Sequence, residues 1–88
     1  MVYNEDLGGV HTNWGYYYFK LGDYEEAVAS YAKAIEFSPD SFDYYNNLGL
    51  ALHQAGKGHE AIGVFRESLA INPDQPKVRG FLKDHNLE

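Results

Sequence analysis

Four histidines and one pair of adjacent glutamates are the residues of this chain whose types could support metal binding or acid–base catalysis. Two histidines can ligate one metal from a helix when they stand four positions apart, and no pair here has that spacing. The histidines are His11, His53, His59 and His85. The carboxylates of Glu25 and Glu26 would point in different directions on a helix, without a nearby serine or histidine partner. The chain also lacks cysteine, a glycine-rich phosphate loop and a nucleophile motif, so we expect no enzyme activity, metal or other cofactor.

The run WGYYYF, residues 14–19, places five aromatic residues around one glycine. Rings concentrated in this way can stack on a base or sugar, hold a peptide, or fill a core. The run alone does not distinguish these roles, because the role of each ring depends on the face of the element that carries it.

The charge balance and hydropathy of the chain limit the classes of partner that it is expected to bind. The net charge is −6, from 7 basic and 13 acidic residues spread along the chain, so the concentrated lysine and arginine that nucleic acids require are missing. Two explanations of the acidity stay open: solubility, and a preference for basic partners. No apolar run approaches about 18 residues, and the N-terminus has no basic segment followed by an apolar one. We expect a cytoplasmic protein that binds neither nucleic acid nor membrane.

The sequence repeats itself with a period of 34 residues. Shifting the chain by that period aligns seven identical residues, where chance would give about two. The identical pairs are Asn13 with Asn47, Gly15 with Gly49, Gly22 with Gly56, Glu26 with Glu60, Ala27 with Ala61, Pro39 with Pro73, and Asp40 with Asp74. A fixed period in this range indicates stacked supersecondary units.

Each unit is expected to form two helices. Apolar residues recur at helical spacing up to Leu21, where Gly22-Asp23 ends the pattern and Asp23 is the predicted N-cap of the next helix. The second helix ends at Ser38-Pro39, because proline restricts the residue before it and donates no backbone hydrogen bond. The later segments with the same pattern are 41–54, 58–71 and 75–86, of which the last opens with Pro76.

These residues resemble the tetratricopeptide repeat, whose signature is W-x₂-L-G-x₂-Y, then A-x₃-F, then P. The first unit offers His11, Trp14, Gly15, Tyr18, Ala27, Tyr31 and Pro39. The second unit offers Tyr45, Leu48, Gly49, Leu52, Ala61, Phe65 and Pro73. The resemblance implies an all-α fold, a right-handed superhelical array of antiparallel helix pairs with five helices. We expect one domain, residues 1–88, with repeats at 8–41 and 42–75, a capping helix at 76–86, and a cloning scar at Leu87-Glu88.

Glycines mark one contrast between the two repeats. Gly15 and Gly49 are expected to let the two helices of a unit approach closely. Gly58 and Gly63 stand where the first repeat has larger residues, and each glycine in a helix interior costs about 0.5–1 kcal/mol relative to alanine. Segment 58–71 should therefore be the least stable full helix.

The repeat allows the aromatic run to be sorted by helix face. Successive residues of a helix are rotated by about 100°, which places one set of apolar residues of the first helix in a single stripe. This stripe is the predicted core, and Tyr17 lies on its flank. The stripe consists of Leu7, Val10, His11, Trp14, Tyr18 and Leu21. The opposite face lines the concave groove in the resembled fold, and the same rotation applies to the second repeat and the last helix. The predicted groove residues are Thr12, Asn13, Tyr16, Phe19, Lys20, Asp43, Asn46, Asn47, Leu50, His53, Gln54, Lys77 and Phe81.

The predicted groove combines rings, amides, one leucine and a few charges. The leading hypothesis is therefore a non-catalytic protein–protein interaction module that binds an extended peptide or a partner helix. Asn13 and Asn47 suit a peptide backbone, because a side-chain amide both donates and accepts hydrogen bonds; solvated polar residues are the alternative interpretation.

The resembled family also has a carboxylate clamp that holds the C-terminal acid of chaperone tails. Asn47 and Lys77 match two of its five positions. The other three positions hold Thr12, Tyr16 and Phe81, which removes most of the positive charge. We expect no binding of that kind.

The alternative function is structural, either self-association or docking within a larger protein. Solenoids usually need about three repeats and polar caps, so two repeats leave their ends uncovered. The first helix has Val2, Tyr3, Val10 and Tyr17 near such an uncovered edge, where a homodimer could form.

Overall fold

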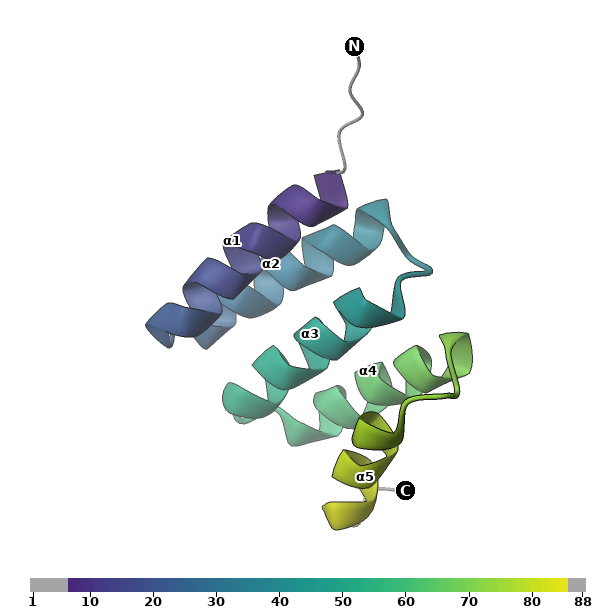
Figure 1. The fold of residues 1–88 in the computed structure, drawn as a ribbon. Coiled ribbons are helices and arrows are strands. Elements are labelled where there is room, and N and C mark those ends of the chain that lie inside the picture. The colour runs from purple at the N-terminus through teal and green to yellow at the C-terminus, as the bar shows by residue number, and fades with distance from the viewer. Residues whose placement is uncertain (1–6, 86–88) are drawn as a thin grey trace.

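The computed structural model describes residues 7–85, and within that range the chain forms helices joined by short turns, without a strand (Figure 1). The five helices are α1 (Leu7–Leu21), α2 (Tyr24–Phe37), α3 (Phe42–Gln54), α4 (Gly58–Ile71) and α5 (Pro76–Asp84). The expected all-α fold with five helices is confirmed. Of the residues named in the sequence predictions, Val2, Tyr3, Leu87 and Glu88 lie outside the described range.

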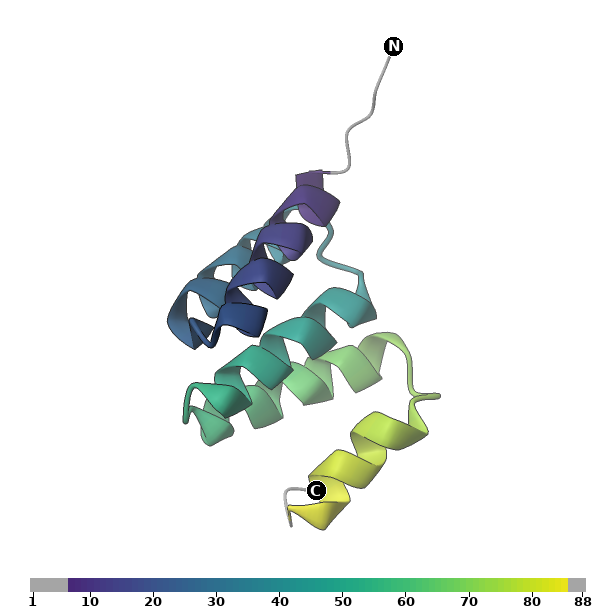
Figure 2. The ribbon, with the colours of Figure 1, turned by 60° about the vertical axis from the view of Figure 1, so that its left-hand side comes forward.

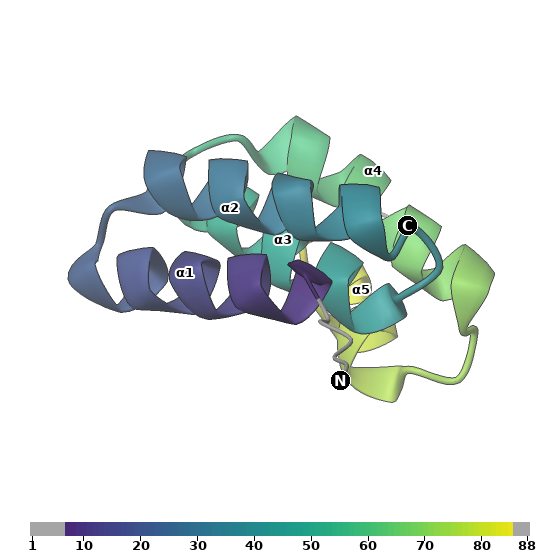
Figure 3. The ribbon, with the colours of Figure 1, turned by 90° about the horizontal axis from the view of Figure 1, so that it is seen from above.

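The helices form two layers. Helix α1 packs antiparallel against α2, α3 packs against α4, and α2 of the first pair contacts α3 of the second. The pairs follow one another along the long axis of a body of 47 × 28 × 16 Å (Figure 2). Seen from above, α1 and α3 lie in one layer with α5, while α2 and α4 form the other (Figure 3). The first helix of every unit thus contributes to the same face.

The turns within each pair form where the sequence places glycine. Gly22 and Gly56 follow α1 and the end of α3, and both have φ of 82°, a left-handed conformation that suits glycine. Asp23 occupies the predicted N-cap position of α2, but its side chain makes no capping hydrogen bond. Its backbone is used instead: the Asp23 amide donates a 2.9 Å hydrogen bond to the carbonyl of Tyr18, and its carbonyl accepts a 3.0 Å hydrogen bond from the amide of Ala27. The start of α2 is therefore set by the glycine turn more than by a side-chain cap.

An aromatic ring lies against a glycine in each helix pair. A Cβ atom added to Gly15 would lie 2.5 Å from the ring of Tyr31, and one added to Gly49 would lie 2.7 Å from the ring of Phe65. Both rings are almost completely buried. Because neither glycine leaves space for a methyl group, close approach is the physical reason for glycine at these two positions.

The predicted core stripe of α1 is wrong for most of its members. Leu7, Val10, Trp14 and Leu21 are 47% to 61% exposed, whereas the buried residues of α1 are its glycines Gly8 and Gly15. The other two members of the stripe, His11 and Tyr18, are half-buried. Helix α1 presents its glycine side to α2, roughly 100° around the helix from Trp14. The most apolar stripe of α1 thus faces away from the described chain.

Candidate functional site

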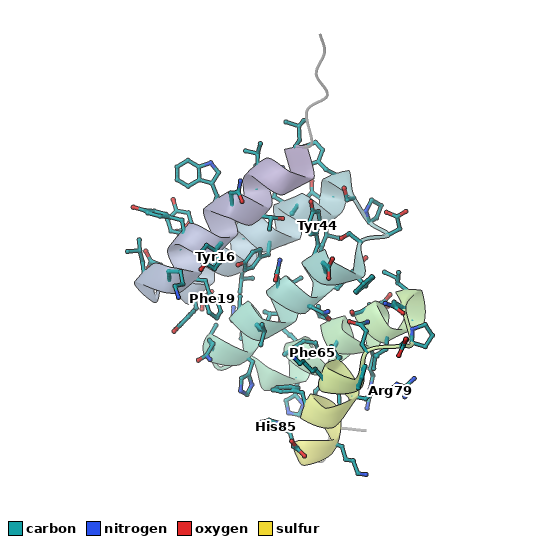
Figure 4. The ribbon with its side chains drawn as sticks, viewed as in Figure 1. Tyr16, Phe19, Tyr44, Phe65, Arg79 and His85 are labelled. Atoms are coloured by element: carbon teal, nitrogen blue, oxygen red, sulfur yellow. The ribbon has the colours of Figure 1, made fainter. Side chains whose placement is uncertain are left out.

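One hollow opens between α1 and α3, on the face that the first helices share. Its lining residues are Tyr16, Phe19, Tyr31, Asn47 and Leu50. Tyr16 and Leu50 are the exposed members, at 59% and 44%, while Tyr31 forms the floor. Figure 4 shows Tyr16 and Phe19 projecting from α1 toward α3. The hollow, called the first hollow below, is apolar except for one amide and two phenol groups.

Neighbouring side chains hold the rings of the first hollow in place. Phe19 makes an edge contact with Tyr24, with ring centroids 5.2 Å apart. The ammonium of Lys20 lies 5.7 Å from the centroid of the Tyr16 ring, within the range of a cation–π contact. Burial, and to a lesser extent the nearby Tyr16, raises the pKa of Tyr31, so its phenol stays neutral well above neutral pH.

A second hollow lies between α3 and α5. Its lining residues are Asn46, Leu50, Phe65, Lys77, Val78 and Phe81. The rings of Phe65 and Phe81 lie 5.0 Å apart and form its apolar wall, and Lys77 supplies a positive charge. Leu50 lines both hollows, so together they form one groove that runs from α1 across α3 to α5. This combination is called the groove below.

A buried amide that the sequence predictions missed fixes one wall of the groove. Gln75 is 8% exposed, and its amide donates hydrogen bonds to the carbonyls of Ser68 and Asn72 and to the Ser68 hydroxyl. Its carbonyl oxygen accepts a 2.7 Å hydrogen bond from Asn46. The donor of Asn46 is thus used inside the protein. The only sequence signal was a polar residue directly before Pro76, which is too common to identify a buried network.

Three histidines gather around Phe81 at the far end of α3, in a hollow of their own. The ring of His53 lies 5.2 Å from Phe81 and 5.4 Å from His85, and His59 lines the same hollow. The Nδ1 atom of His85 is 2.8 Å from the carbonyl oxygen of Phe81. Among residues 7–85, no group of three His, Cys, Asp or Glu side chains has a geometry that could hold a metal ion.

The structure separates several predicted groove residues from the groove. Asn13 lies on another side of α1, in a hollow with Val10, Trp14 and Tyr17. The hydroxyl oxygen of Thr12 is buried without a hydrogen-bond partner.

Of the four remaining predicted residues, Lys20 lies over the Tyr16 ring beside the first hollow, His53 lines the separate histidine hollow, and two lie at the ends of α3. Asp43 and Gln54 are exposed at the first turn and the last position of α3, and neither lines a hollow described above. The predicted residues that the structure does bring together are Tyr16, Phe19, Asn46, Asn47, Leu50, Lys77 and Phe81.

No helix within the described part of the chain is long and apolar enough to cross a membrane.

Comparison with known proteins identifies the repeat. The family described as TPR repeat matches residues 15–56, and the one described as tetratricopeptide repeat matches residues 42–75. DnaJ homolog subfamily C member 7 of Mus musculus is 36% identical over 67 residues, which is 76% of this chain and 13% of that protein. Serine/threonine-protein phosphatase 5 of Homo sapiens is 35% identical over 66 residues, 75% of this chain and 13% of that protein.

A third relative carries the repeat in its name. Tetratricopeptide repeat-containing protein trd-1 of Caenorhabditis elegans is 31% identical over 70 residues, 80% of this chain and 9% of that protein. The chain thus spans 9% to 13% of the length of these three relatives. Both helix pairs, their glycine–aromatic contacts and these matches agree, and the chain belongs to the tetratricopeptide repeat family.

Proposed function

We propose that this protein–protein interaction module binds an extended peptide along the groove, with apolar side chains of the peptide in the first and second hollows. The observation that carries the proposal is Leu50, a large apolar side chain that is 44% exposed and lines both hollows from the middle helix. An exposed apolar residue with concave apolar surface on both sides is typical of a binding site. Proteins of this family are generally non-catalytic, so we propose binding without turnover.

The polar groups of the groove define the chemistry of the peptide. Asn47 lies in the first hollow, where its amide can both donate to and accept from a peptide backbone. Asn46 is less available, because one of its two amide hydrogens is already bonded to Gln75. Lys20 beside the first hollow and Lys77 in the second are both positive, which favours a peptide with acidic residues next to its apolar ones.

Selection from a random-peptide phage library, followed by fluorescence anisotropy with the selected peptides, tests this proposal. We expect Leu50→Ser to weaken binding about three- to tenfold, because complete burial of a leucine contributes about 1.5–3 kcal/mol and 44% of Leu50 is exposed before binding. Lys77→Ala should weaken acidic peptides and reduce the salt dependence of their binding. Neither residue is buried, so the far-ultraviolet circular dichroism of the variants should match that of the parent chain.

Ile71→Ser is the matched control, since Ile71 is also an exposed apolar residue, at 38%, but lines neither hollow. It should leave peptide affinity unchanged. The proposal is wrong if no peptide is enriched over background, or if selected peptides bind Leu50→Ser as tightly as the parent chain.

A further inference from the structure

We infer that the outer face of α1 is a self-association surface, which pairs with the same face of a second copy of this chain. This outer face consists of Leu7, Val10, Trp14, Tyr17 and Leu21. Each of the five is between 47% and 61% exposed, and together they are most of the exposed large apolar residues of the described chain. The surface is distinct from the groove, so the inference does not depend on the proposed function.

The internal repeat allows the outer face of α1 to be compared with the equivalent face of α3, which another helix covers. A shift of 34 residues places Trp14 on Leu48 and Tyr17 on Ala51. In α3 that face is covered by α2: Ala51 is 0% exposed and packs in one cluster with Ala27 and Tyr31. The outer face of α1 is therefore built like a surface that receives another helix, and no helix among residues 7–85 covers it.

Aromatic contacts within one copy of the chain hold the rings of the outer face in place in the absence of a partner. The ring of Trp14 makes an edge contact with Tyr17 at 5.9 Å and stacks on Tyr18 at 6.0 Å. Tyr18 is half-buried, so it anchors the other two rings to the body of the molecule. Val10, Asn13, Trp14 and Tyr17 line a shallow hollow there. Ordered aromatic rings lose little side-chain entropy on binding and are frequent hot spots of interfaces.

Charge selects a second copy as the occupant. Helix α1 has no acidic residue in its sequence LGGVHTNWGYYYFKL, and Lys20 is its only formally charged residue, although the chain carries a net charge of −6. Two copies can therefore bring their α1 helices together without burying a charge or placing acidic residues opposite each other on these helices.

The other end of the molecule does not offer a matching surface. The exposed residues of α5 include Lys77, Arg79 and Lys83, so head-to-tail stacking would bring three cations against α1, which has no acidic residue to pair with them. A two-fold pair instead places apolar surface on apolar surface and leaves polar α5 at both outer ends.

Asn13 gives the pair its orientation. It is exposed and lies beside Val10, Trp14 and Tyr17 on the same hollow. A side-chain amide both donates and accepts, so two copies of Asn13 on either side of a two-fold axis can bond to each other. A single polar residue inside an apolar helix interface is a known means of fixing register.

The size of the outer face predicts a weak dimer. Five half-exposed side chains of this size would bury roughly 500 Å² per copy, close to the lower limit of about 1,000 Å² in total for a specific interface. The pair should therefore dissociate on dilution through the micromolar range.

The experiment combines sedimentation equilibrium with tryptophan fluorescence over a dilution series of the 88-residue chain. Trp14 is the only tryptophan, so its emission reports on the outer face alone. We expect a dimer mass at high concentration, and a shift of the emission to longer wavelength at the same concentrations at which the mass falls to that of a monomer. Val10→Lys should lower the dimer affinity at least tenfold, and Asn13→Asp should weaken it through two facing carboxylates.

Leu50→Lys is the matched control, because Leu50 is similarly exposed at 44% but lies in the groove. It should leave the dimer intact, and all three variants should keep the helical circular dichroism of the parent chain. A monomer at every concentration overturns the inference, whether the Trp14 emission is that of a water-exposed or of a covered ring. Open-ended assembly, which indicates head-to-tail contacts, or a dimer that Leu50→Lys breaks and Val10→Lys spares, overturns it equally.

Discussion

Adding one methyl group at Gly15 or at Gly63 tests the packing with two identical changes in opposite surroundings. A Cβ atom at Gly15 would lie 2.5 Å from two atoms of the Tyr31 ring, and that residue is only 4% exposed. A Cβ atom at Gly63, on the exposed side of α4, would meet no atom within 4 Å. The two substitutions therefore share their effect on the helix backbone and differ in what the methyl group contacts.

The expected free energies of unfolding change in opposite directions. Replacing glycine by alanine inside a helix stabilises it by about 0.5–1 kcal/mol, and Gly63→Ala should keep that whole gain. At Gly15 the Tyr31 ring cannot move freely, and overpacking of a core costs about 1–3 kcal/mol, which exceeds the gain. A change of 1 kcal/mol shifts Tm by about 4–8 °C in a domain of this size. Gly63→Ala should thus raise Tm by several degrees, and Gly15→Ala should lower it.

Thermal and urea unfolding followed by circular dichroism provide the measurement, at one low protein concentration because association also raises Tm. A double-mutant cycle identifies the cause: with Tyr31→Leu, which removes the ring, Gly15→Ala should lose most of its penalty. The explanation is refuted if both alanines stabilise the chain equally, or if shortening Tyr31 leaves the effect of Gly15→Ala unchanged.

Three further predictions concern a buried phenol, a turn and a buried amide. The raised pKa of Tyr31 means that the folded chain keeps this phenol neutral where the unfolded chain ionises it. Stability should be intact below the ordinary tyrosine pKa of 10.0 and fall as the pH rises above it; Tyr31→Phe should show a smaller fall in alkaline urea titrations. Gly56→Ala should destabilise the chain by about 1 kcal/mol in urea unfolding, because its φ of 82° strains any residue with a Cβ; Gly56→Asn should cost less. Gln75→Met should cost about 1–3 kcal/mol, because Asn46 loses its acceptor, and amide hydrogens of α5 should exchange faster; unchanged exchange would contradict the network.

The local features of this fold could be predicted from the sequence because each depends on a few neighbouring residues. Gly22 and Gly56 end helices through their own backbone conformation, and Pro39 and Pro73 stop helices wherever they occur. Gly15 and Tyr31 share a contact that the 34-residue repeat copies at Gly49 and Phe65, which is why a resemblance in sequence carried a resemblance in packing.

The candidate groove could be predicted only in part. A helix wheel placed Tyr16, Phe19 and Leu50 on one side, and these residues line one hollow in the structure, because successive residues of a helix turn by a fixed angle. It could not show that the Asn46 amide donates a hydrogen bond to Gln75, since hydrogen bonds between distant residues depend on how the helices pack.

The sequence by itself determined the helices, their turns and the repeat, since propensity, glycine and proline act through local backbone geometry. The tertiary structure decided which side of α1 is buried. A wheel centred on Trp14 finds the most apolar stripe, but α2 packs on the glycine side, where the ring of Tyr31 can approach the backbone. A hydrophobic pattern indicates that a helix face will be covered, but it does not identify the surface that covers it. That depends on which partner surface is present, and for the outer face of α1 it is absent from residues 7–85.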